Sequence, residues 1–220
     1  MAKGNMRQAF IEAVIEAAEA SSMREVHVAK LIKQLGVNRN TFYYHFASKY
    51  DVALQIFRED IAAELEAEVP VEELLRTPLK GDGSGPLLPY FVHRELGARN
   101  LDAGDFNRCL ARCVTKRPRF YSKLFCNRDQ EFRVCFEELY RPALQDDLFF
   151  MLGGRYLPQE TQDYILDVLL GRVFHLASYH LLNPKDSAVL LDDRVNPFWN
   201  GPYESLQLAL QRHTVNRIRR

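Results

Sequence analysis

The stretch VAKLIKQLGVNRNTFYYHFASK, residues Val28 to Lys49, decides the fold of this chain. Its first part carries apolar residues at helical spacing, which places them on one buried face of a helix that ends at Leu35. Gly36 follows, and glycine adopts the left-handed backbone of a helix end without a steric penalty. Asn38 suits the N-cap of a second short helix, Arg39 to Phe46, because its side-chain oxygen accepts an orphan backbone N–H. The pattern predicts two helices joined by a tight turn.

The exposed surface of the second helix carries polar and aromatic residues. Phe42 and Phe46 are four residues apart and are expected to point inward, so the other side chains face outward or sideways. These are Arg39, Asn40, Thr41, Tyr43, Tyr44 and His45. A short helix with such a face is typical of one that enters a DNA groove, where Arg and Asn can read base edges.

The segment GVNRNTFYYHFASKYDVALQIF, Gly36 to Phe57, resembles the helix-turn-helix of the TetR family of transcriptional regulators. The matching features are Gly36-Val37, Thr41-Phe42-Tyr43, His45-Phe46, and Ser48-Lys49 at the start of a long helix. The family usually has a Thr that caps the first helix of the motif, whereas this chain has His27, so a weaker cap is expected there. The resemblance covers the N-terminal part of the chain, and the rest agrees with the family only in size and helical character.

The outward face and the resemblance together nominate the DNA contacts. We expect Lys49, Tyr43 and the Thr41 hydroxyl to contact phosphates, and Arg39 and Asn40 to read base edges. Tyr44 and His45 suit either role. The full candidate set is Val28, Asn38, Arg39, Asn40, Thr41, Tyr43, Tyr44, His45 and Lys49.

Composition and charge favour a soluble, cytoplasmic globular protein. The 220 residues are 47% hydrophobic and 26% charged, and the formal net charge is zero. Neutrality argues against binding nucleic acid by bulk charge, but sequence-specific binding can rest on a local patch. The most apolar long stretch, Tyr164 to Leu182, contains Asp167, Arg172, His175 and His180, which we judge too polar for a lone membrane span.

The remaining chain reads as helical, and the predicted fold class is all-α. We expect a three-helix DNA-binding domain at residues 1–47 and a helical effector-binding and dimerisation domain at residues 48–220, joined by a long helix from Ser48. Further expected elements are a loop at Thr77 to Pro89, helices at Leu88 to Leu101, Asp102 to Val114, Tyr121 to Phe150, Pro158 to Leu182 and Pro202 to Thr214, and a short helix at Ser187 to Leu191. Strands are not expected, because period-two alternation is absent over any useful length.

The resemblance also implies a mechanism. Family members are mostly repressors that bind a palindromic operator as homodimers, and ligand binding in the C-terminal domain moves the fourth helix and spoils the half-site spacing. Here the helices at 158–182 and 202–214 are expected to form the dimer contact. The expected partners are therefore double-stranded DNA, a second copy of the chain and a small-molecule effector, whose pocket residues stay unknown.

Other chemistry leaves three alternatives open. The chain carries no nucleophile, phosphate-loop or zinc-hydrolase motif, so an enzyme is not expected, and neither a cofactor nor a metal is. Cys109 and Cys113 are expected to lie one helical turn apart. They are either core residues or parts of a thiol sensor or metal site. The basic run from Arg108 to Arg133 is a surface balanced by acidic neighbours, or a site for an anionic ligand. The third alternative concerns the function of the whole chain: a helical ligand-binding or redox-sensing protein of the same fold that does not bind an operator.

Overall fold

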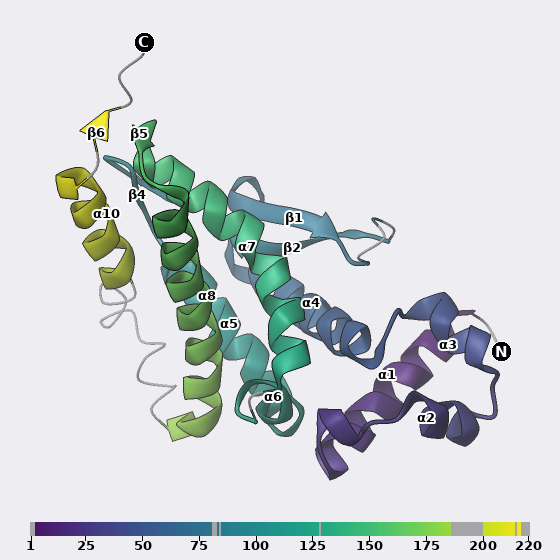
Figure 1. Ribbon diagram of the computed structural model, residues 1–220. Helices are drawn as coiled ribbons and strands as arrows, with labels where there is room; N and C mark the ends of the chain where they lie inside the picture. Colours follow the sequence, from purple (N-terminus) through teal and green to yellow (C-terminus); the bar gives the residue numbers. More distant parts are fainter. Residues whose placement is uncertain are drawn as a thin grey trace.

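A computed structural model shows a mostly helical protein with a few short strands (Figure 1). It describes residues 3–80, 83, 85–127, 129–185, 200–213 and 215–216. The helices are α1 (Lys3–Ala20), α2 (Val28–Leu35), α3 (Arg39–His45), α4 (Lys49–Glu68), α5 (Gly104–Lys116), α6 (Pro118–Phe125), α7 (Gln130–Leu152), α8 (Gln159–Leu182) and α10 (Gly201–His213). The all-α prediction is confirmed as the fold class.

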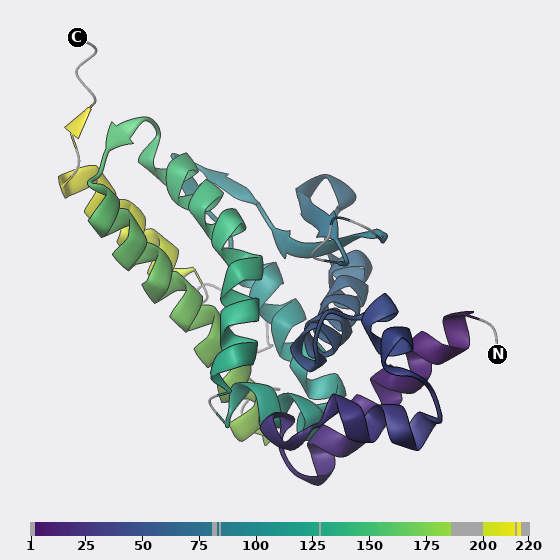
Figure 2. The ribbon, with the colours of Figure 1, turned by 45° about the vertical axis from the view of Figure 1, so that its right-hand side comes forward.

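Helices α1, α2 and α3 form one end of the molecule, which we call the head. The helices and strands from α4 onward form the body, and both views place α8 and α10 on the side away from the head (Figures 1 and 2). The head has an aromatic centre, because Phe10 of α1 packs against Phe42 and Phe46 with ring centroids 5.2 and 6.4 Å apart. All three rings are at most 1% exposed.

The body is built around α4, whose middle and end are buried against α5, α7 and strand β2 (Leu87–Val92). Phe57 of α4 lies within 6.3 Å, centroid to centroid, of four aromatic rings. Those rings belong to Tyr121, Phe125, Phe136 and Tyr140. This continuous apolar packing supplies most of the stability of such a domain.

The expectation of a strand-free chain is wrong. Strand β1 (Leu74–Pro78) pairs antiparallel with β2, from Leu74↔Val92 to Pro78↔Leu87, with a bulge after Leu75. The two strands take up the ends of the loop predicted at Thr77 to Pro89, and strands β2, β3 and β4 replace the helix predicted at Leu88 to Leu101. A continuous apolar run such as LLPYFV suits a buried strand as well as a helix, and Pro89 disfavours the helix.

The other strands are short, and the 3-10 turns bracket helices. The strands are β3 (Glu95–Gly97), β4 (Asn100–Leu101), β5 (Arg155–Tyr156) and β6 (Val215–Asn216), and the turns are η1 (Met23–Glu25) and η2 (Val71–Glu73). Strand β3 pairs with β4, and β5 with β6. Leu96, which falls within the helix predicted at Leu88 to Leu101, lies in β3 and is 51% exposed.

The predicted helix from Tyr121 to Phe150 is two helices, α6 and α7. The second begins where the Asp129 side chain accepts a hydrogen bond from the Phe132 N–H at 3.2 Å, an ordinary N-cap. Pro142 lies inside α7 without ending it. The predicted helix at Asp102 to Val114 appears as α5, two residues later at each end. The predicted short helix from Ser187 to Leu191 lies outside the described residues.

The late helices agree with the sequence pattern. Helix α8 begins after Pro158 and α10 begins at Gly201. By length and composition alone, α8 is apolar enough to cross a membrane, contrary to the judgement made on Tyr164 to Leu182, and 39% of its most apolar window is buried inside the protein. The buried core helix of a soluble protein meets the same criterion.

Candidate nucleic-acid interface

The turn of the helix pair has the predicted geometry. Leu31 of α2 is 2% exposed, and the helix ends at Gly36 with φ of 65°, in the left-handed region. The Gly36 N–H donates to the carbonyls of Ile32 and Lys33, which closes the last turn. At the other end, His27 occupies the N-cap without a side-chain hydrogen bond, so the expected weaker cap is confirmed.

Helix α3 begins at a well-formed cap. Asn38 Oδ1 accepts a hydrogen bond from the Thr41 N–H at 2.9 Å and another from the Thr41 hydroxyl at 3.0 Å. The Thr41 hydroxyl proton is therefore already engaged, which weakens the case for Thr41 as a phosphate donor. The Asn38 amide, whose oxygen serves as the cap, keeps its NH₂ group for an external acceptor. Asn38 is exposed and Thr41 is half-buried.

The outer face of α3 carries the predicted reading residues. Arg39 and Asn40 are exposed, and Tyr43 and Tyr44 are 45% and 63% exposed. The Arg39 guanidinium lies over the Tyr43 ring, 5.3 Å from its centroid. Such stacking orients both side chains on the surface that the sequence assigns to DNA.

Two of the candidates lie at the edge of this face. The His45 ring is half-buried between Tyr44, at 4.9 Å, and Phe10, at 6.5 Å, so packing fixes its position. The Val28 side chain is half-buried against the head core. Val28 is also the first residue of α2, so its backbone N–H is the group that can bind a phosphate.

Lys49 ties the head to α4. Its ammonium donates to the carbonyls of Arg24, at 2.8 Å, and Val26, at 3.1 Å, and lies 5.1 Å from the centroid of the Tyr50 ring. Ser48 caps α4 by accepting the Asp51 N–H at 3.1 Å, as the sequence predicts. Because an ammonium has three N–H donors, one remains for a phosphate.

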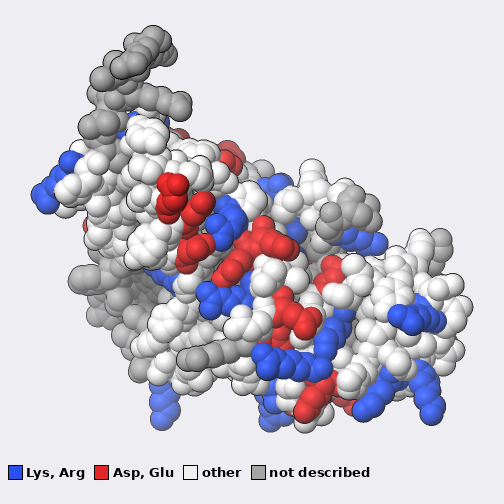
Figure 3. Space-filling model, in the orientation of Figure 1, with Lys and Arg blue, Asp and Glu red and all other residues white. Residues whose placement is uncertain are grey.

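Three cations of the helix pair α2–α3 have no carboxylate partner among the described residues, whereas Arg7 of α1 pairs with Glu59 of α4 at 2.7 Å. Within the described residues, no carboxylate oxygen lies within 4.0 Å of the Lys30, Lys33 or Arg39 side chains. In Figure 3 the right-hand end of the molecule shows blue side chains with little red beside them, whereas red and blue interleave over the middle. Unneutralised cations on an exposed helix pair are the electrostatic footprint of a nucleic-acid contact.

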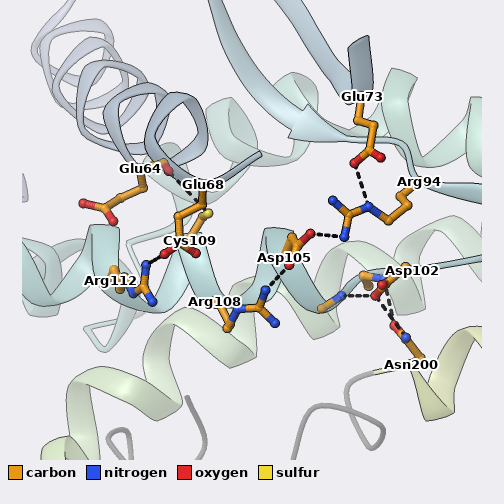
Figure 4. A network of polar contacts seen from close by, with 12 residues as sticks. Glu64, Glu68, Glu73, Arg94, Asp102, Asp105, Arg108, Cys109, Arg112 and Asn200 are labelled. Carbon is orange, nitrogen blue, oxygen red and sulfur yellow. Dashed lines mark hydrogen bonds and ion pairs between the residues drawn. The ribbon is translucent and has the colours of Figure 1, made fainter. Parts of the chain in front are cut away.

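The first four cations of the basic run, Arg108, Arg112, Lys116 and Arg117, are neutralised instead. Lys116 lies 2.8 Å from Glu64, Arg117 lies 2.9 Å from Asp60, and Arg112 pairs with Glu68. Farther along, Asp105 bridges Arg94 and Arg108, and Arg94 also meets Glu73 at 2.6 Å (Figure 4). These contacts join α5 to α4 and to the end of the hairpin. The α5 part of the run is therefore a balanced surface, which disfavours an anion site there.

The thiols are poor sensors. Cys109 and Cys113 are both 0% exposed, and burial raises the pKa of Cys109 to about 12 and that of Cys113 well above its usual value. A buried, protonated thiol reacts slowly with oxidants. Burial and pKa therefore disfavour the redox-sensing alternative. Within the described chain, no group of three metal-binding side chains gathers around these cysteines.

Comparison with known proteins identifies the head. Residues 10–56 match the family model described as bacterial regulatory proteins, tetR family. Among solved structures, a chain titled dihydroxyacetone kinase operon activator DhaS is similar at 14% identity, with a TM-score of 0.44, over 93% of this chain and 94% of that one. A likeness at that level carries no argument about function. A search of curated proteins finds no match.

Proposed function

We propose that this chain, whose residues 10–56 form a DNA-binding domain of the tetR family of bacterial regulatory proteins, is a transcriptional regulator that binds a palindromic operator as a homodimer. The observation that carries the proposal is the outer face of α3. It presents Arg39, Asn40 and Tyr43 to solvent on a helix whose opposite side, Phe42, is 0% exposed. No acidic side chain in the described structure neutralises Arg39.

The proposed contacts divide into two groups. Arg39 and Asn40 read base edges, because they are exposed and have the fork and amide geometry that guanine and adenine accept. Tyr43, Lys49 and the start of α3 hold the phosphate backbone and set the register. At the start of α3, the Asn38 amide replaces the Thr41 hydroxyl as the favoured donor. Tyr44 and His45 lie beside this set and suit either role.

The proposed dimer contact is the outer face of α8 and α10. Tyr164, Val168 and Leu182 of α8 are 69%, 52% and 67% exposed, and Leu208 of α10 is 47% exposed. Gly171 lies on the same stripe of α8, and no described atom comes within 4 Å of a Cβ built there. An apolar face with room for close helix approach favours burial against a second copy. Light scattering should give a dimer, and a stable monomer at micromolar concentration would break this part of the proposal.

The body completes the proposal as an effector domain. We propose that a small molecule bound by the body shifts α4, which runs directly from the head, and so changes the spacing of two recognition helices. The regulator would then act as a ligand-responsive repressor in the cytoplasm, without enzymatic activity. The domain boundary near residue 47 remains part of this proposal.

Selection of bound duplexes from a random DNA pool tests the proposal. We expect a twofold-symmetric motif whose half-sites are about 10–10.5 base pairs apart, centre to centre, or a multiple of that spacing. Recovery of sequences without any shared motif would overturn operator binding. Such a result would favour a ligand-binding protein that keeps the fold without reading DNA.

A further inference from the structure

A groove of about 730 Å³ lies where the head meets the body. Its walls come from the end of α3, the first turns of α4, the β1–β2 hairpin and the middle of α7. Leu54, Leu79, Tyr90 and Leu139 give it an apolar and aromatic lining. This volume falls within the usual range for a small-molecule site.

One buried cation lies in the wall of this groove. Arg58 of α4 is 3% exposed, and its guanidinium donates to the carbonyls of Thr77 at 2.8 Å, Pro78 at 3.0 Å and Leu88 at 3.3 Å. Its Nε atom is buried and donates to nothing in the described structure. The guanidinium also lies 5.7 Å from the centroid of the Tyr90 ring.

Arg58 has no counter-charge among the carboxylates that the structure describes. Of the carboxylates that the structure describes, none comes within 4.0 Å of its guanidinium. Removing a cation from water costs several kcal/mol, and carbonyl dipoles offset only part of that cost. Burial accordingly lowers the pKa of Arg58. An anion placed beside it would supply the missing charge at short range and in a low dielectric.

The two described acids that line the groove are Asp51 and Glu138. The Asp51 carboxylate is engaged by the Ala47 N–H at 2.8 Å and by the Gln55 amide at 3.1 Å. Glu138 is exposed, with no ion pair or hydrogen bond from its side chain in the described structure. It therefore lies at the solvent-exposed edge of the groove, where screening weakens but does not abolish its repulsion of an anion, while Arg58 lies inside.

We propose that this groove binds a small aromatic carboxylate, with its ring against the apolar lining and its anion toward Arg58. The inference rests on the proposed function, because it names the class of effector and its site. Tyr43, Tyr44 and His45 of α3 also line the groove, so side chains that are proposed to contact or border the operator would also border the ligand. Ligand and operator affinities would then be reciprocally coupled.

Calorimetry on the full-length chain tests the charge requirement. The probe is 1-naphthoate, and its neutral isostere 1-naphthamide is the matched ligand. We expect naphthoate to bind at least tenfold more tightly, because only it carries the anion. Absence of naphthoate binding at millimolar concentration, or equal affinity for the two ligands, would overturn the proposal.

Two substitutions of opposite expected sign sharpen the test. Arg58→Met should weaken naphthoate binding at least tenfold, and Glu138→Gln should strengthen it about twofold to fivefold by removing a repelling charge. Neither should change naphthamide binding by more than about twofold. Glu138 is exposed, so its variant keeps the test valid even where Arg58→Met disturbs the hairpin. Glu131→Gln, at an exposed position near the start of α7, is the matched control and should change nothing.

Thiol alkylation locates the bound ligand. Cys135 is half-buried and lines the groove, whereas Cys126 is half-buried with its Sγ 3.9 Å from the Ser178 carbonyl and is not part of the groove. Naphthoate should slow alkylation of Cys135 by N-ethylmaleimide and leave Cys126 unchanged. Protection of neither thiol, or of both alike, would place the ligand elsewhere and overturn the site.

These measurements use no DNA, so they separate the two proposals. Naphthoate bound in the groove without operator binding would uphold the site and overturn the regulator. A selected operator without naphthoate binding would overturn the site alone.

Discussion

Helices α3 and α5 both carry cations, and the two helices use them in opposite ways. On α5, Arg108, Arg112 and Lys116 each meet a carboxylate, and two of the three carboxylates belong to α4. On α3, Arg39 stacks on Tyr43 and meets no described carboxylate. A basic run in the sequence is a candidate anion site only where no acidic side chains lie close to it in space.

Helix α4 belongs to both regions. Its first residue, Lys49, holds two backbone carbonyls of the head, and its later residues Asp60, Glu64 and Glu68 hold α5. Partly exposed ion pairs contribute only about 0–1 kcal/mol each, so the aromatic core around Phe57 carries more of the stability. The pairs instead join α4 to α5 and to the start of α6 at three defined points. The predictions below compare the roles of the head and the body.

The largest effect is expected from the head core. Phe42→Ala removes a ring that is 0% exposed and packs against Phe10, and such truncations cost about 3–5 kcal/mol of unfolding free energy. Urea denaturation followed by circular dichroism measures it. Tyr44→Ala, at a 63% exposed position, is the control and should cost less than about 1 kcal/mol. Equal costs for the two variants would contradict the inward placement of Phe42.

Arg39→Ala should relax base preference. Removing one bidentate side chain costs about 1–3 kcal/mol for the cognate base and flattens one base pair in each half-site. Selection from a random DNA pool, repeated with the variant, measures this change in base preference. Arg112→Ala in the body is the matched control and should leave the motif unchanged. A motif that is identical in wild type and Arg39→Ala would remove Arg39 from base readout.

The phosphate contacts should show a smaller and sequence-independent effect. Lys49→Ala and Tyr43→Ala should weaken binding to all duplexes alike, and Lys49→Ala should lower the slope of log affinity against log salt by about 1. Lys49→Gln separates loss of charge from loss of the hydrogen bonds to the Arg24 and Val26 carbonyls. An unchanged salt slope in both Lys49 variants would count against a phosphate role.

The smallest effect concerns pH and the body alone. His93 Nδ1 lies 2.8 Å from Asp147 Oδ1, and this hydrogen bond raises the pKa of His93 above its usual value of 6.5. A raised pKa in the folded state means that the stabilisation is complete below pH 6.5 and is lost as the pH rises through the folded pKa. The urea concentration at the unfolding midpoint should therefore decrease slightly as the pH rises above 6.5. His93→Gln should remove this pH dependence. An identical pH profile in the variant would contradict the pair.

The sequence predicts the head in detail because its signals are local. Gly36 at the turn, Asn38 at the cap and the i, i+4 pair Phe42 and Phe46 each depend on neighbours within a few residues. The Asn38 oxygen and the Thr41 hydroxyl were expected to serve different partners, and the structure pairs them with each other at 3.0 Å. This pairing, and the hydrogen bonds from Lys49 to the Arg24 and Val26 carbonyls, needed the coordinates.

The sequence fails on the hairpin because its signals are not local. Residues 87–92 form an unbroken apolar run, and whether it is strand or helix depends on pairing with Leu74 to Pro78 across a loop. Arg58 is the residue that sequence reasoning missed. It falls inside an ordinary amphipathic helix, and only its burial against three hairpin carbonyls distinguishes it from a surface arginine.

The central claim is that the outer face of α3 reads a specific duplex. The most direct test is a fluorescence anisotropy titration of the wild-type chain with its selected duplex and with a scrambled duplex of equal length, at physiological salt. The account predicts at least about 10³-fold tighter binding to the selected duplex. Equal affinity for the two duplexes would contradict it.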